Sequence, residues 1–212
     1  MNVLVTGGAG FIGSHIAEAC CREGARVRVL DNFDTGSQGN LAWIRSGDPV
    51  EIVNGDIRDR VVTAKAMQGC DWIFHQAAVA SVPASVEHPE ETNAANLTAV
   101  LQMLLLARDT GVKRFIFASS SAVYGDDPTP VKTEDLGPRP ISPYGLQKYA
   151  AERYAVMFHQ LYGLETVSLR YFNVFGPRHS FDSPYSGVIA RFCTRSLARE
   201  RPTIFGDGGQ SR

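Results

Sequence analysis

The sequence lacks the excess of positive charge that is typical of proteins that bind nucleic acids or anionic membrane surfaces. Its formal net charge is −1 over 212 residues, so no basic surplus exists to attract a polyanion. No apolar run approaches the roughly 18 residues of a membrane span, and Met1 leads directly into a strand-like segment without a basic or apolar leader. We therefore expect small-molecule partners, with no nucleic acid and no membrane.

Cysteine is scarce as well. Cys20, Cys21, Cys70 and Cys193 are the four present, and they form no C-x-x-C pair. Two adjacent cysteines on one helix cannot form an ordinary disulfide, which favours a reducing compartment. We expect a cytoplasmic protein in which all four cysteines serve as packing residues.

What the sequence does contain is a regular alternation of strand-like and helix-like segments. Such alternation predicts an α/β fold built on a doubly wound parallel sheet. The stretch from 126 to 143 is rich in proline and predicts an ordered loop over the functional site. The strand-like runs lie near 2–6, 26–30, 50–53, 72–75, 114–118 and 165–170, and the helical patterns near 12–23, 59–68, 91–109 and 143–162.

A glycine turn separates the first strand from the first helix. Gly7, Gly10 and Gly13 satisfy the pattern G-x-x-G-x-x-G. Glycine allows positive φ and a close approach of a pyrophosphate, while the N–H groups at the helix start favour an anion. Asp31 ends the second strand about 20 residues on, where a ribose hydroxyl needs an acceptor. Its carboxylate would repel a 2′-phosphate, so the sequence predicts NAD and not NADP.

A second group of residues indicates proton transfer. Tyr144 and Lys148 lie four residues apart on a predicted helix, hence on one face. The ammonium, helped by an oxidised nicotinamide, would lower the pKa of the phenol towards working pH and make it a general base. Ser119, Ser120 and Ser121 follow a buried strand, at the edge where α/β sheets place ligands. A Tyr/Lys pair alone usually has only a role in packing. The prediction of proton transfer depends on its combination with the serines and the glycine turn.

These motifs resemble those of the extended short-chain dehydrogenase/reductases and, within them, the nucleotide-sugar epimerases of the UDP-glucose 4-epimerase type. The resemblance implies a Rossmann-fold NAD-binding domain over residues 1–170 that contains the catalytic Ser, Tyr and Lys. It further implies that residues 171–212 are the start of a smaller, C-terminally truncated substrate-binding region. Other matching motifs lie at 55–59, 75–78, 81–83, 120–125, 169–174, 176–178 and 204–208.

The resemblance also implies roles for individual positions. The catalytic hydroxyl falls on Ser120, with Ser121 one position late, and Tyr144 and Lys148 complete the catalytic set. The implied cofactor contacts are Gly7, Gly10, Phe11, Ile12, Gly13, Asp31, Asn32, Asp56, Ile57, Gln76, Ala77, Ala78, Asn96, Tyr144, Lys148, Tyr171 and Phe172. The implied substrate contacts are Ser81, Ser120, Ser121, Tyr144, Asn173, Val188 and Arg212.

The function implied is NAD-dependent epimerisation at C4 of a nucleotide-diphosphate sugar, of the UDP-glucose/UDP-galactose type. Ser120 would bond the sugar O4, Tyr144 would take the hydroxyl proton, and hydride would pass to NAD and return to the other face of a transient 4-keto sugar. No metal is required. The sequence does not distinguish plain from N-acetylated hexoses.

Other functions stay open at this point. Sugar-nucleotide 4,6-dehydratases carry Asp-Glu directly after the catalytic hydroxyl residue, whereas Ser121 and Ala122 stand here, which favours epimerisation. Decarboxylases and reductases of the same family also remain. Because relatives continue beyond Arg212, an inactive NAD-binding fragment is a further alternative.

The resemblance implies a homodimer that associates through a four-helix bundle. Two predicted helices, one over 91–109 and one over 143–162, would supply the contact face. The apolar candidates for that face are Leu101, Leu104, Leu105, Ala151, Tyr154 and Phe158.

Overall fold

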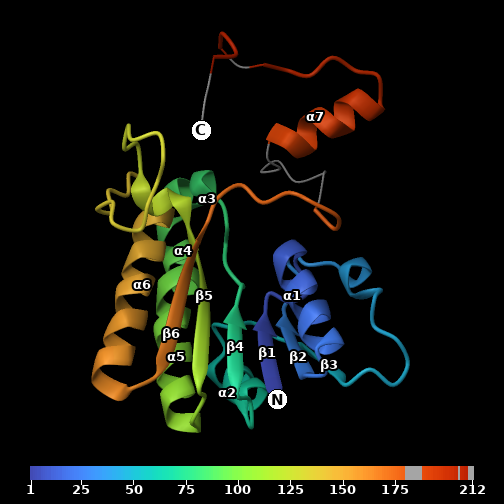
Figure 1. The fold of residues 1–212 in the computed structure, drawn as a ribbon, viewed down its shortest axis with the longest axis vertical. Helices are drawn as coiled ribbons and strands as arrows, with labels where there is room; N and C mark the ends of the chain where they lie inside the picture. The colour runs from blue at the N-terminus through green and yellow to red at the C-terminus, as the bar shows by residue number, and fades with distance from the viewer. Residues whose placement is uncertain (180–187, 205, 210–212) are drawn as a thin grey trace.

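A six-stranded parallel sheet forms the centre of the molecule (Figure 1). The computed structural model describes residues 1–179, 188–204 and 206–209. The strand order is β3-β2-β1-β4-β5-β6, which confirms the predicted doubly wound sheet and puts the crossover point between β1 and β4. The strands are β1 (Asn2–Thr6), β2 (Arg26–Asp31), β3 (Val50–Asn54), β4 (Trp72–His75), β5 (Arg114–Ser120) and β6 (Glu165–Tyr171).

Helices cover both faces of this sheet. One face packs on α1, where Ala17 belongs to the same apolar cluster as Val3 and Val5 of β1. The other face packs on three helices around Phe115 and Phe117 of β5. Strands buried on both faces need near-continuous apolar runs, which is the pattern by which they were predicted. The helices are α1 (Phe11–Arg22) on the first face and α2 (Arg60–Met67), α5 (Ala99–Thr110) and α6 (Pro143–Tyr162) on the second.

The helix predicted over 91–109 contains one wide turn. The chain runs from α4 (Pro89–Asn93) through a π-helical turn, η2 (Ala94–Thr98), and into α5. The backbone keeps right-handed helical dihedrals where these elements join, so the three form one continuous helix. Turns of this kind occur frequently at functional sites.

Four elements have no counterpart among the sequence-based predictions. Two are single 3-10 turns, and a third is a helix of six residues, too short to show an apolar period. The fourth, α7, stands apart from the sheet in Figure 1, and its described side chains are exposed. The elements are η1 (Gln38–Leu41), α3 (Val82–Glu87), η3 (Ser121–Tyr124) and α7 (Val188–Leu197).

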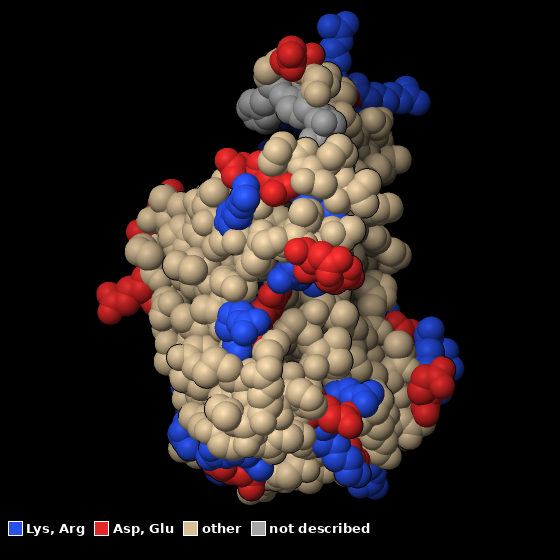
Figure 2. All heavy atoms as spheres, turned by 60° about the vertical axis from the view of Figure 1, so that its left-hand side comes forward, with Lys and Arg blue, Asp and Glu red and all other residues tan. Residues whose placement is uncertain are grey.

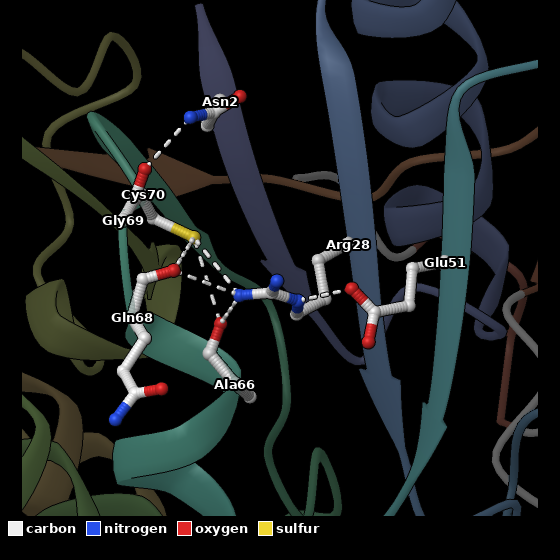
Figure 3. Close-up of polar contacts among 7 residues, drawn as sticks. All are labelled: Asn2, Arg28, Glu51, Ala66, Gln68, Gly69 and Cys70. Atoms are coloured by element: carbon white, nitrogen blue, oxygen red, sulfur yellow. Dashed lines mark hydrogen bonds and ion pairs between the residues drawn. The ribbon is translucent and has the colours of Figure 1, made fainter.

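Arg28 links β2 to its neighbours (Figure 3). Its Nε donates to the Glu51 carboxylate of β3 at 2.7 Å, and its Nη1 donates to the carbonyl oxygens of Ala66 at 2.6 Å and Gln68 at 3.1 Å. These carbonyls belong to the C-terminal end of α2, where the helix dipole favours a cation. Arg28 therefore fastens α2 to the sheet.

Two predictions about side chains are wrong in part. Cys193 is exposed on α7, whereas Cys70 is buried and the other two cysteines are half-buried. On the predicted dimer face, Leu104, Ala151 and Phe158 are buried inside the protomer, because they pack in the core cluster under the sheet. Within the described ranges, no helix has the length and apolar character that crossing a membrane demands.

Candidate active site

The glycine turn lies at the crossover between β1 and β4. Gly7 has φ +65°, and its N–H donates to the Leu30 carbonyl oxygen at 2.8 Å. A Cβ on Gly7 would lie 2.7 Å from the Ala77 nitrogen, and one on Gly13 would lie 2.1 Å from the Gly7 carbonyl oxygen. Only glycine fits at these two positions, so the turn presents bare backbone to a ligand.

The start of α1 supplies donors for an anion. Gly10 occupies the N-cap without a side-chain cap bond, and the first turn carries no acidic residue. The Ser14 N–H bonds to the Gly10 carbonyl oxygen at 3.0 Å. The N–H groups that precede Ser14 in the first turn have no intrahelical acceptor and lie at the positive end of the helix dipole. A dinucleotide diphosphate fits this cradle.

Asp31 lies beside the turn at the end of β2. Its Oδ2 accepts the Ala9 N–H at 2.9 Å, and its Oδ1 accepts the Phe33 N–H at 2.8 Å. A carboxylate offers about four acceptor positions, so two remain for ribose hydroxyls. The glycine cradle and this acid together fit NAD.

Arg58, close in sequence to the end of β3, is paired with an acid. Arg58 donates to Asp56 through Nε at 2.9 Å and Nη2 at 2.6 Å, and Asn32 donates to the same carboxylate at 3.1 Å. The hydrogen bonds from Arg58 lower the pKa of Asp56 to about 2. Asp56 and buried Ile57 stay predicted cofactor contacts.

Ser120, Tyr144 and Lys148 come together at the carboxyl end of β5. Ser120 is the last residue of that strand, and the other two lie one turn apart on α6. Lys148 Nζ donates to the Ala118 carbonyl oxygen at 2.8 Å and lies 5.8 Å from the centroid of the Tyr144 ring. The side chains of Tyr144 and Ser120 contact one another. The three side chains therefore form one group at the same sheet edge as the glycine turn.

Local sequence fixes where α6 begins. Ser142 caps the helix by accepting the Gly145 N–H at 3.1 Å, and Pro143 occupies its first turn. The Tyr144 N–H, which a helix start leaves without an internal acceptor, donates to the Ser85 hydroxyl of α3 at 3.1 Å. A Cβ on Gly145 would lie 2.7 Å from the Ala122 carbonyl oxygen, so glycine lets α6 approach η3 closely.

Burial governs the protonation of Tyr144 and Lys148. Burial raises the pKa of the Tyr144 phenol above its usual value of 10, and the contact with Ser120 lowers it in part. Burial lowers the pKa of Lys148 from 10.5 to about 8. Burial in the protein alone thus acts against the predicted lowering of the pKa of Tyr144, and a lowering by Lys148 together with an oxidised nicotinamide stays a prediction.

His75 lies close to Lys148 as a neutral imidazole. Burial, and then the charge of Lys148, lower the pKa of His75 to about 3. Its Nδ1 lies 2.7 Å from Thr6 Oγ1, and its ring stacks on Phe117 with centroids 5.9 Å apart. His75 therefore adds no charge beside Lys148 at neutral pH.

Two predicted contact residues form side-chain hydrogen bonds within the protein. Asn96 accepts the Val79 N–H at 2.9 Å and donates to the Val79 carbonyl oxygen at 3.1 Å. Ser81 caps α3 by accepting the Ala84 N–H at 3.1 Å. Both shape the loop after β4, and their contacts with cofactor and substrate stay predictions.

A buried polar group beside Lys148 was not predicted. Glu152, one turn further along α6, accepts the Ser119 hydroxyl at 2.5 Å. Arg170 of β6 donates to both Glu152 oxygens at 2.9 Å, and its guanidinium lies 4.8 Å from the centroid of the Tyr124 ring. These contacts join β5, β6, η3 and α6 around the site. In the sequence, Glu152 could have been found from the four-residue spacing that it shares with Tyr144 and Lys148.

The predicted contacts after β6 are less closely gathered. Tyr171 ends β6 half-buried, and burial raises the pKa of its phenol above 10. Phe172 and Asn173 follow it on the surface. Val188 is 57% exposed at the start of α7, and Arg212 lies outside the described residues.

The segment after Phe172 returns to α1. Arg178, with φ +67°, donates to the Glu18 carboxylate of that helix. The Phe11 ring stacks on His179, with centroids 4.8 Å apart. Residues 176–179 therefore lie against the helix that carries the anion cradle.

Comparison with known proteins gives a consistent result. A family model described as the NAD dependent epimerase/dehydratase family matches residues 3–212. The chain is 39% identical over 213 residues to a putative UDP-glucose 4-epimerase of Methanocaldococcus jannaschii, covering 99% of this chain and 68% of that protein.

Solved structures agree with that match. A UDP-N-acetylglucosamine 4-epimerase from Methanobrevibacter ruminantium M1, in complex with UDP-N-acetylmuramic acid, is 43% identical with a TM-score of 0.93, covering 99% of this chain and 66% of that one. The UDP-glucose 4-epimerase of Thermus thermophilus, in complex with NAD, is also 43% identical, with a TM-score of 0.85 over 94% of this chain and 64% of that one. The chain thus spans about two thirds of the length of these relatives.

Proposed function

The chain belongs to the NAD-dependent epimerase/dehydratase family, and on that premise we propose that it epimerises a UDP-sugar at C4. The observation that carries the proposal is the group of Ser120, Tyr144 and Lys148 at the sheet edge that also holds the glycine cradle. The similar UDP-sugar 4-epimerases named above support this choice of reaction and substrate class.

Each residue of the group has a separate task in this proposal. The Ser120 hydroxyl bonds the sugar O4 and orients it, and the Tyr144 phenolate oxygen takes the O4 proton as hydride leaves C4. The Lys148 ammonium stabilises the phenolate and keeps its position through Ala118. Bound NAD would supply the hydride acceptor and, when oxidised, a positive charge that favours the phenolate.

Inversion then requires that the sugar turn over while its diphosphate stays bound. The Tyr144 phenol returns its proton to O4 when hydride comes back to the other face of the 4-keto sugar. Ser81, Ser121, Asn173, Val188 and Arg212 are proposed to hold the nucleotide sugar. The proposed division of the chain keeps the cofactor domain at 1–170 and the substrate-binding region at 171–212.

Dehydration is the second reaction that the family name allows. It needs an acid and a base next to the catalytic hydroxyl residue, and Ser121 and Ala122 of η3 occupy those positions. Neither side chain can move a proton as a carboxyl group does. Epimerisation is therefore the proposal that this chain favours.

We also propose that the protein is a cytoplasmic homodimer held by α5 and α6. Figure 2 brings the α6 side forward and shows broad uncharged surface between separated charged groups. Exposed apolar residues of α6 include Met157 at 42%, Leu161 at 67% and Tyr162 at 50%. Sedimentation of wild type and Leu161→Lys tests this: the dimer should weaken in the variant, and a monomeric wild type contradicts the proposal.

Product analysis tests the reaction. The full-length protein is incubated with UDP-glucose, UDP-galactose and their N-acetyl counterparts, and the products are identified. Interconversion of a 4-epimer pair supports the proposal and names the sugar. A 4-keto-6-deoxy product identifies a dehydratase, and bound NAD without turnover of any sugar contradicts the assignment.

A further inference from the structure

Two primary amides meet inside the protomer, next to the proposed catalytic pair. Gln147 lies directly before Lys148 on α6, and its Oε1 accepts a hydrogen bond from Asn96 Nδ2 of η2 at 2.9 Å. Gln147 Nε2 donates to Thr92 Oγ1 of α4 at 3.0 Å and approaches the Pro89 carbonyl oxygen at 3.5 Å. This amide contact joins positions more than 50 residues apart in the chain.

All three side chains of this contact are removed from water. Asn96 is 1% exposed, Thr92 is 2% and Gln147 is 4%. Each amide group has partners: Asn96 bonds Gln147 and both backbone groups of Val79, and the Thr92 hydroxyl donates to Pro89. A buried network that is fully bonded specifies one arrangement, because any other leaves polar groups unpaired.

The direction in which Gln147 points from α6 determines how the network can act on Tyr144 and Lys148. Successive residues are about 100° apart around a helix, so Gln147 points about 60° to one side of Tyr144 and about 100° from Lys148. Lys148 is bonded to β5, and Gln147 is bonded to α4 and η2. The helix is thus held from two directions at the turn that carries the phenol and the ammonium.

A second bond acts at the same end of α6. The Tyr144 N–H donates to the buried Ser85 hydroxyl of α3 at 3.1 Å. Further along α6, Ala151, Ala155 and Phe158 are buried apolar positions, and the Glu152 carboxylate bonds Ser119 of β5 and Arg170 of β6. Polar ties to α3, α4 and η2 therefore gather in the first two turns, and apolar packing follows them.

We infer that Gln147 is a positioning residue: its bonds to Asn96 and Thr92 set the rotation of α6 and hence the place of Tyr144 and Lys148. A rotation of about 10° would move a group at the outer helix radius of about 5–6 Å by about 1 Å. A displacement of about 1 Å can lower a catalysed rate about 100-fold. Apolar packing tolerates such a rotation better than the two directed hydrogen bonds of Gln147 do.

The inference rests on the proposed function, so its test includes a measurement that needs no turnover. Gln147→Leu removes the bonds at similar volume, and Gln160→Leu makes the same change at an exposed position of the same helix. Thr92→Val removes the acceptor for Gln147 Nε2, whereas Thr92→Ser keeps it. The full-length protein with bound NAD is used, and kcat and KM are measured for the sugar that turns over.

We expect Gln147→Leu to lower kcat at least about 10-fold with KM changed less than about 3-fold. Thr92→Val should lower kcat several-fold, and Thr92→Ser and Gln160→Leu should match wild type. The second readout is the carbon-13 ring signal of Tyr144 beside the hydroxyl, identified by its loss in Tyr144→Phe. This signal and its pH midpoint should move in Gln147→Leu and Thr92→Val only.

The outcomes separate the two ideas. If the wild type turns over no nucleotide sugar, the proposed function fails, and the Tyr144 signal still decides whether Gln147 positions the phenol. If Gln147→Leu does not fold, Thr92→Val provides the decision by the same two readouts. An unmoved Tyr144 signal in the folded variants, or an equal loss of kcat in Thr92→Val and Thr92→Ser, overturns the inference.

Discussion

Lys148 donates a hydrogen bond to the Ala118 carbonyl oxygen at 2.8 Å, and this bond joins the helix of the proposed base to the strand that ends in Ser120. The lysine is 3% exposed, and burial lowers its pKa to about 8. The fold therefore keeps a poorly hydrated cation at the place where a phenolate needs one. Such a group favours function at the expense of stability.

Lys148→Met measures separately what this lysine contributes to catalysis and what it contributes to stability. We expect kcat to fall about 100- to 1,000-fold, because the phenolate loses its neighbouring cation. Stability at pH 7 should change little, since the lost bond is offset by removal of a buried charge. The folded pKa lies below the unfolded one, so the stability of wild type relative to the variant should rise between about pH 8 and 10.5. Denaturant unfolding at pH 7 and 10 checks the sign, and a flat difference contradicts it.

The Glu152–Arg170 pair, which joins α6 to β6, should be far more important for stability than the exposed Arg114–Glu165 pair between β5 and β6. Glu152→Gln leaves the largely buried Arg170 without its counter-charge, and we expect a loss of about 2–4 kcal/mol. Glu165→Gln breaks the exposed pair with Arg114 and should cost less than about 1 kcal/mol. Equal losses in urea unfolding would show that Arg170 is adequately hydrated without Glu152.

Acid should destabilise the fold through His75 before it does so through the carboxylates. Burial lowers the pKa of His75 from 6.5 to about 3, so the unfolded chain binds more protons between these values, and stability falls as pH drops from 6.5. The full effect is at most about 5 kcal/mol. Asp56, with a pKa of about 2, acts only below about pH 4. Unfolding of wild type and His75→Gln from pH 7 to 4 should show a steeper loss for wild type; parallel curves contradict the assignment.

Gly13→Ala should remove the cofactor site. The added Cβ would lie 2.1 Å from the Gly7 carbonyl oxygen, so the turn must distort, and we expect NAD affinity to fall at least about 10-fold. Gly137→Ala is the matched control, because nothing lies within 4 Å of its Cβ. Titration with NAD measures both variants. Unchanged affinity in Gly13→Ala would mean that the turn does not hold the diphosphate.

Much of this architecture could be predicted from local sequence, for physical reasons. Strands buried on both faces leave apolar runs, and a turn with Cβ-free positions such as Gly7 leaves a glycine pattern. The spacing of Tyr144 and Lys148 places them on one helix face whatever the tertiary structure. These features depend on residues close together in the chain.

The features that escaped prediction depend on tertiary contacts. Gln147 meets Asn96 from 51 residues away, and Ser119 meets Glu152 from 33 residues away, which no periodicity signals. Whether the pKa of Tyr144 is raised or lowered also depends on burial, and burial is a property of the assembled fold. The proposed catalytic residues could therefore be named from sequence, and the structure was needed to show what holds and tunes them.

The most direct test of the proposed C4 epimerisation measures turnover of nucleotide sugar by wild type and by Tyr144→Phe, each with its bound NAD quantified. We expect Tyr144→Phe to keep its NAD and to lose at least about 100-fold in kcat for the 4-epimer interconversion, because O4 has lost its base. Near-normal interconversion by Tyr144→Phe with NAD bound would contradict this proposal.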